Sequence, residues 1–246
     1  MASDSPLSRW RANGTRPLAW SLVVAALGWI WGTGEVRAEA GDRPAAARAP
    51  TLYHKDRSFR IPFNVNEQGR SQLKEVQLWV SEDSGVHWKA TSRTRPDLGK
   101  FTFRAAQDGE YWFAVRTVTT DDRYSPPLDQ AVEPSMKVIV DSTPPSLVLE
   151  ADERRGSMAQ VRWVAKDENL DLKSLILEYQ VEGVREWRQA PIRKPAVVGA
   201  QRWDAGTADR LRVKASVADK AGNVVESVIA LPEGSAASPD FASPDP

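Results

Sequence analysis

The chain has 246 residues, with 33 basic and 33 acidic side chains, two histidines and no cysteine. The absence of cysteine excludes disulfide scaffolds, thiol catalysis, zinc ribbons and iron–sulfur clusters. The balanced charge removes the electrostatic reason to expect nucleic acid as the main partner.

Residues 1–40 have the layout of a secretory signal peptide. Three arginines precede an uncharged apolar stretch, and Ala38-Glu39-Ala40 after it has the small-x-small pattern of a cleavage site. We therefore expect cleavage after Ala40 and a secreted or periplasmic protein with no membrane span after cleavage. The alternative is an uncleaved anchor, because the apolar stretch approaches the length that spans a bilayer.

The rest of the chain is predicted to be all β between two disordered ends. Residues 41–51 are rich in Ala, Pro and Arg and indicate a linker, while residues 232–246 are rich in Pro and Ser and indicate a tail. Between them, apolar and polar residues alternate with the period of two that is typical of strands. The runs that alternate are 61–65, 76–80, 111–115, 161–165, 175–179 and 211–215.

The two halves of this region repeat each other. When the first half is shifted by about 100 positions, three of its strands and one tryptophan align in order with those of the second half. This repeat length is the size of one small β-sandwich. Trp88 matches Trp187 in this alignment, and two prolines at 144–145 end the last strand of the first half. We expect one β-sandwich domain at 52–141, a Pro-rich hinge at 142–145 and a second domain at 146–231.

Two motifs resemble those of known β-sandwich families. Tyr111-Trp112-Phe113-Ala114-Val115 resembles a late strand of fibronectin type III and immunoglobulin-like domains, and Asp219-Lys220-Ala221-Gly222-Asn223 resembles a turn of bacterial immunoglobulin-like modules. The resemblance implies two tandem immunoglobulin/fibronectin type III-like β-sandwiches. Leu211 stands where a Tyr would form the tyrosine corner of the second domain.

A third motif, at residues 81–88, resembles the Asp-box. It reads Ser81-Glu82-Asp83-Ser84-Gly85-Val86-His87-Trp88 and has the Ser-x-Asp-x-Gly-x-x-Trp pattern. Asp83 can accept hydrogen bonds from the backbone of a turn, Gly85 can adopt a positive φ, and Trp88 can pack beneath the hairpin. We interpret the motif as a structural turn.

The sequence indicates no enzyme, and no cofactor is expected. His54 precedes the first domain and His87 lies in the hairpin, and neither belongs to a recognisable nucleophile or metal motif. A hydrolase built from scattered carboxylates is the third alternative for the function, after binding and accessory roles.

An aromatic surface is predicted on the first domain. If Val76, Leu78 and Val80 point into the core, Trp79 points outward, and the same alternation places Trp112 and Arg116 outward on the next strand. We expect these three side chains to form a partner-binding surface, with a purely structural aromatic pair as the alternative. The corresponding residues of the second domain, Ile176, Glu178, Arg212 and Lys214, are predicted to be an ordinary solvated face.

Acidic residues gather near the hinge. The loops at 167–171 and 219–223 are predicted to lie at the same pole as Asp141, and their oxygen ligands could hold Ca²⁺. Ordinary turn-forming Asp and Asn residues are the alternative.

Together these features predict a non-catalytic binding or spacer protein of the cell exterior, with an extracytoplasmic protein or glycan as partner. An accessory subunit that docks on a secreted enzyme or an envelope complex is the alternative.

Overall fold

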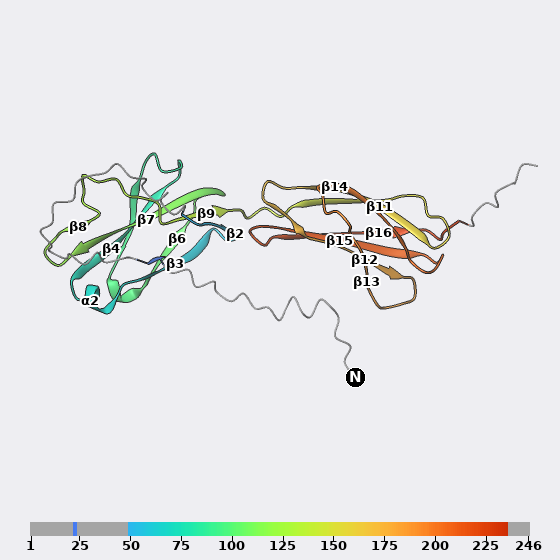
Figure 1. The fold of residues 1–246 in the computed structure, drawn as a ribbon, viewed down its shortest axis with the longest axis horizontal. Coiled ribbons are helices and arrows are strands. Elements are labelled where there is room, and N and C mark those ends of the chain that lie inside the picture. Colours follow the sequence, from blue (N-terminus) through green and yellow to red (C-terminus); the bar gives the residue numbers. More distant parts are fainter. Residues whose placement is uncertain (1–21, 24–48, 236–246) are drawn as a thin grey trace, which may run out of the picture. The chain divides into compact units, whose positions relative to one another are not determined.

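The computed structural model describes residues 22–23 and 49–235, and the account that follows concerns these residues (Figure 1). The predicted signal cleavage site, most of the predicted linker and residues 236–246 of the predicted tail lie outside them. Two residues of the predicted signal segment form strand β1 (Leu22–Val23), which pairs in parallel with β3 (Ser58–Asn64). No helix in the described ranges has the length and apolarity needed to cross a membrane.

The chain divides into two compact units. Unit 1 contains Met1–Leu52 and Arg57–Ile139, and unit 2 contains Tyr53–Asp56 and Val140–Pro246. Each unit is described by itself below.

The large sheet of unit 1 has the strand order β2, β9, β7, β4, β5, with the short β8 (Tyr124–Ser125) beside β7. The bounds are β2 (Thr51–His54), β9 (Met136–Val140), β7 (Gly109–Thr119), β4 (Leu73–Ser81) and β5 (Lys89–Thr94). The second sheet pairs β3 with β6 (Lys100–Arg104). A short helix α2 (Glu67–Arg70), capped by the side chain of Asn66, and a 3-10 turn η1 (Pro96–Leu98) lie in the connections.

The core of unit 1 is aromatic. Tyr111 and Phe113 of β7 are 2% and 0% exposed, and Phe103 of β6 packs edge-on against both, with ring centroids 5.3 and 4.9 Å away. The hydroxyl of Tyr111 donates to the carbonyl of Gln107 at 2.8 Å, so the one polar atom of this buried ring is satisfied. The tyrosine corner of immunoglobulin-like β-sandwiches makes the same kind of bond, from the tyrosine hydroxyl to the backbone a few residues earlier.

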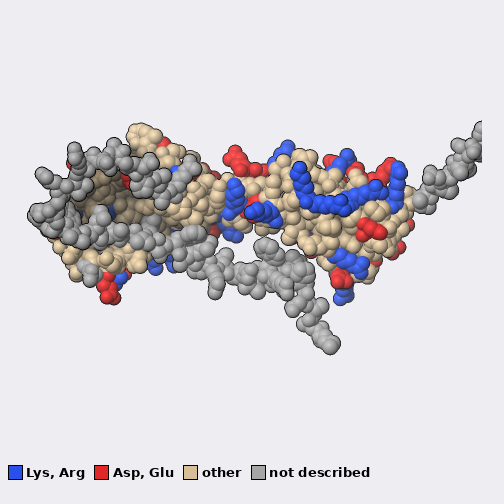
Figure 2. All heavy atoms as spheres, viewed as in Figure 1, with Lys and Arg blue, Asp and Glu red and all other residues tan. Residues whose placement is uncertain are grey.

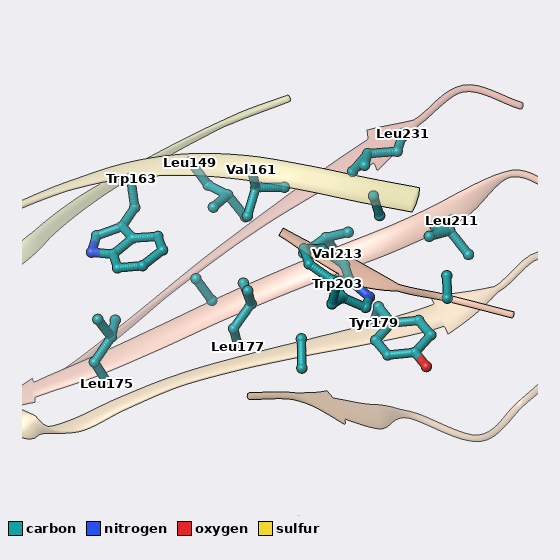
Figure 3. Close-up of a cluster of buried hydrophobic side chains, with 14 of the residues drawn as sticks. Leu149, Val161, Trp163, Leu175, Leu177, Tyr179, Trp203, Leu211, Val213 and Leu231 are labelled. Carbon is teal, nitrogen blue, oxygen red and sulfur yellow. The ribbon is translucent and has the colours of Figure 1, made fainter. Parts of the chain in front are cut away.

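Unit 2 is built from a three-stranded and a four-stranded sheet. The first has the order β10 (Ser146–Ala151), β11 (Met158–Lys166), β14 (Val198–Asp204). The second has the order β13 (Arg188–Ala190), β12 (Leu170–Val181), β15 (Leu211–Asp219), β16 (Val224–Leu231). Side chains from both sheets form one core between them, as Figure 3 shows for Leu149, Trp163 and Leu177 among others.

Two residues of unit 2 make contacts that the strand pattern does not show. The indole N–H of Trp163 donates to the carbonyl of Ala196 at 2.9 Å. The ring lies so close to Gly199 that a Cβ on this glycine would be 2.3 Å from Cζ2 of the indole. Arg154 is 3% exposed, and its guanidinium donates to the carbonyls of Thr207, Asp209 and Pro232. Burial lowers the pKa of Arg154.

The two units repeat one pattern of pairing. The β4–β7 pair of unit 1 corresponds to β12–β15 of unit 2, and β3–β6 corresponds to β11–β14. Trp88 directly precedes β5 and Trp187 directly precedes β13, so the matched tryptophans hold the same place in both units. The prediction of an all-β chain built from β-sandwiches is confirmed.

Candidate functional site

Unit 1 brings the three predicted site residues to one face of its large sheet. Trp112 lies opposite Ser81, Ala114 opposite Trp79, and Arg116 opposite Gln77 in the β4–β7 register. Residues directly opposite each other in a sheet point to the same side. Val76, Leu78 and Val80 are 0%, 0% and 4% exposed, so the predicted phase of β4 is confirmed.

Arg116 is not at the surface, contrary to the prediction. It is 4% exposed and donates through Nη2 to the carbonyls of Pro127 and Gln130, at 3.2 and 2.9 Å. The chain after β8 therefore covers this part of the face, which the alternation within β7 could not show. Arg116 does stack on Trp79, with Cζ 4.8 Å from the ring centroid, so it positions that indole.

Trp79 and Trp112 remain half-buried on this face. The N–H of Trp79 donates to Oε1 of Gln77 at 3.4 Å, whereas the buried Nε1 of Trp112 has no acceptor among the described residues. Lys137 of β9 places Nζ 3.5 Å from the ring centroid of Trp112. Sequence reasoning missed Lys137, although its outward position follows from the apolar alternation of β9.

The hairpin between β4 and β5 folds onto the same face. Asp83 accepts hydrogen bonds from the backbone N–H of His87 and the hydroxyl of Ser81, both at 2.8 Å, and these bonds hold the pKa of Asp83 well below its usual range. Gly85 has φ +88°, and a Cβ there would lie 2.9 Å from the ring of Trp112. Trp88 is half-buried and donates to the carbonyl of Gly85 at 3.0 Å.

The two histidines lie in local turns. His87 places Nδ1 2.6 Å from Oδ2 of Asp83, and its side chain is exposed. Nδ1 of His54 accepts from the backbone N–H of Asp56 at 3.1 Å. Both imidazoles therefore have local partners.

The matching face of unit 2 is not an ordinary solvated face. Lys214 is 7% exposed and pairs with Glu178 at 2.8 Å, with Trp187 over it at 4.7 Å from Nζ to the ring centroid. The prediction was wrong for these two residues because the hairpin before β13 folds its tryptophan back over the sheet. Arg212 is exposed as predicted, and Ile176 is half-buried.

Three carboxylates of unit 2 meet as the loop argument predicted. Oxygen atoms of Asp141, Asp167 and Asp219 all lie within 4.8 Å of one another. Asn169 donates to Asp141 at 2.7 Å and to Asp167 at 2.6 Å, and Asn223 donates to Asp219 at 2.7 Å. Burial raises the pKa of Asp167, and the charges of Asp141 and Asp219 raise it further.

This arrangement predicts a response to cations and to pH. A carboxyl whose pKa is raised in the folded state destabilises the fold above its unfolded pKa of 3.8, and the destabilisation is relieved as the pH falls through the folded value. Asp167→Asn should therefore raise the melting temperature at neutral pH. Excess Ca²⁺ should raise that of the wild type and not of Asp167→Asn. Equal melts with Ca²⁺ and with chelator would leave only the turn-forming role.

No family model matches the chain, and no curated protein matches its sequence. Among solved structures it is similar to fibronectin(III)-like modules of CbhA from Clostridium thermocellum, with 13% identity and a TM-score of 0.41 over 78% of this chain and 93% of that chain. It is also similar to a Bacteroides uniformis protein provisionally named as carbohydrate binding, with 12% identity and a TM-score of 0.25 over 71% of this chain and 98% of that chain. Both TM-scores are below 0.5, so these likenesses carry no argument about function.

Proposed function

We propose that the chain is a secreted or periplasmic, non-catalytic binding protein whose unit 1 contacts an extracytoplasmic protein or glycan. The contact surface is the outer face of β4 and β7 around Trp79 and Trp112. The signal pattern of residues 1–40 supports this compartment. The alternative is an accessory subunit that docks on a secreted enzyme or an envelope complex through the same face.

One observation carries the proposal. Two indoles from neighbouring strands lie half-buried on one face, and each has a cation stacked on it, Arg116 on Trp79 and Lys137 on Trp112. A stacked cation reduces the rotational freedom of an indole before any partner binds, which lowers the entropy lost on binding. Tryptophan and arginine are also the residues in which binding energy is concentrated at interfaces. Arg116 itself is 4% exposed, so its contribution is to hold Trp79 in place.

The test is a pull-down from the native envelope fraction with variants of this face. Trp79→Ala and Trp112→Ala should leave unit 1 folded and should each reduce partner recovery about tenfold or more, because each removes an anchor that a partner would cover. The matched control is Leu98→Ala, which removes an apolar side chain that is 52% exposed and lies on η1, outside this face.

The outcomes separate the alternatives. Recovery of one enzyme that is lost with either tryptophan favours the accessory role, whereas retention on a glycan column that is lost in the same way favours adhesion. If both variants are folded and recover the same partners as the wild type, the aromatic face is structural and the chain acts as a spacer.

A further inference from the structure

Unit 2 carries a second surface, independent of the face proposed for unit 1. On the outer side of the four-stranded sheet, Lys214 lies between Glu178 and Val228 in the register, and Arg212 lies between Gln180 and Ala230. The hairpin tryptophan, Trp187, covers the middle of this surface.

Lys214 has its charge satisfied within the unit. Its Nζ is 2.8 Å from Oε2 of Glu178, and only 9% and 18% of these two side chains are exposed. Because Trp187 shields the pair from water, this pair contributes little to the field that a partner would meet.

Arg212 differs from the cations around it. Its guanidinium Cζ lies 5.8 Å from the ring centroid of Trp187, and no carboxylate of the described chain pairs with it. Arg210, two positions earlier, pairs with Glu233 at 3.6 Å. A guanidinium that lies over an aromatic ring can still bind both oxygens of a carboxylate, because its N–H groups point outward in its own plane. Arg212 is therefore an exposed cation with no ion-pair partner among the described residues. Figure 2 shows Lys and Arg side chains gathered on the visible face of unit 2.

Apolar groups lie beside this cation. Val228 is 47% exposed, and Ala230, opposite Arg212 on the edge strand β16, is also exposed. The exposed Val228 offers van der Waals contact and no hydrogen bonds, which suits an aliphatic side chain better than the hydroxyl groups of a sugar.

We propose that Arg212, Trp187 and Val228 form a docking site for an extended acidic segment of a partner protein. A carboxylate of that segment binds Arg212, and an aliphatic side chain next to it packs on Val228 and the indole edge. The carboxylate complements the charge of Arg212, which has no ion-pair partner among the described residues, and the aliphatic side chain complements the apolar groups beside it.

The test titrates the full chain with a terminally blocked peptide of alternating leucine and glutamate. Nuclear magnetic resonance monitors the side-chain N–H groups of the protein during the titration. Titration should shift the Nε–H of Arg212 and the Nε1–H of Trp187 saturably. Arg212→Gln should weaken binding about tenfold or more, because a charge-assisted bidentate contact is lost, and Arg212→Lys should recover only part of it. Arg210→Gln is the matched control, since it removes the same charge from a neighbouring arginine that already has a partner.

Four results would overturn the proposal: no saturable shift with the wild-type chain, equal loss of binding in Arg212→Gln and Arg210→Gln, equal binding of a peptide with glutamine in place of glutamate, or tighter binding of polygalacturonate than of the peptide. The last result would assign the surface to an acidic glycan. Because the peptide is expected to bind unit 2, these results do not depend on whether Trp79 and Trp112 of unit 1 bind a partner.

Discussion

Replacing Trp163 with alanine should lower the free energy of unfolding of unit 2 by about 3–5 kcal/mol, as expected for removal of a buried aromatic ring. Trp163 is 2% exposed, lies in the core of unit 2 and donates its indole N–H to the carbonyl of Ala196. The variant loses the packing of the ring and leaves that carbonyl without its donor. Urea denaturation followed by far-ultraviolet circular dichroism measures the loss. Val198→Ala, at a position 63% exposed on β14, should change stability by about 0.5 kcal/mol or less.

The same site allows a sharper test through Gly199. A Cβ on Gly199 would lie 2.3 Å from Cζ2 of Trp163, so Gly199→Ala alone should destabilise unit 2 by about 1–3 kcal/mol through overpacking. In the Trp163→Ala background the obstructing ring is gone, and the alanine should have almost no further effect. A double-mutant cycle measures this coupling. An equal penalty in both backgrounds would show that backbone preference, and not the indole, selects glycine at this position.

Arg154 is the second position where a large effect is expected. Arg154→Met should lower the free energy of unfolding by about 3–5 kcal/mol, because it removes the buried guanidinium that donates to three carbonyl groups. Those carbonyls belong to Thr207, Asp209 and Pro232. Chemical denaturation monitored by circular dichroism provides the measurement.

The control for Arg154 is the adjacent Arg155→Met. The side chain of Arg155 is 75% exposed and pairs only weakly, at 3.7 Å from Glu153, so its loss should change stability by about 0.5 kcal/mol or less. If the two variants are equally stable, water must replace the guanidinium at the three carbonyls, and the hydrogen bonds of Arg154 do not contribute substantially to the stability of unit 2.

The sequence predicted what depends on local periodicity. Alternation placed Val76, Leu78 and Val80 in the core and Trp79 outside it, and the structure agrees. The loop argument also brought Asp141, Asp167 and Asp219 to one place, because strand order determines which loops share a pole of a sandwich.

The errors arose where residues outside the strand itself cover its surface. Arg116 and Lys214 were predicted to be exposed, yet both are buried, one beneath residues 127–130 and the other beneath Trp187. Period-two alternation reports which side of the sheet a residue faces and contains no information on what lies above that side. The contact of Gly199 with Trp163 and the bonds of Arg154 had no local signal, because each joins elements far apart in sequence.

The bonds around Arg154 also determine where unit 2 would first resist a pull on its last described residues. Besides the guanidinium contact to Pro232, the backbone N–H of Gly156 donates to the carbonyl of Ser235 at 2.9 Å, and the N–H of Ser235 donates to the carbonyl of Arg154 at 3.2 Å. A force pulling on the chain beyond Ser235 meets these bonds before it reaches β16. The segment after β16 is therefore tied to the turn before β11 by bonds from both the backbone and the Arg154 side chain.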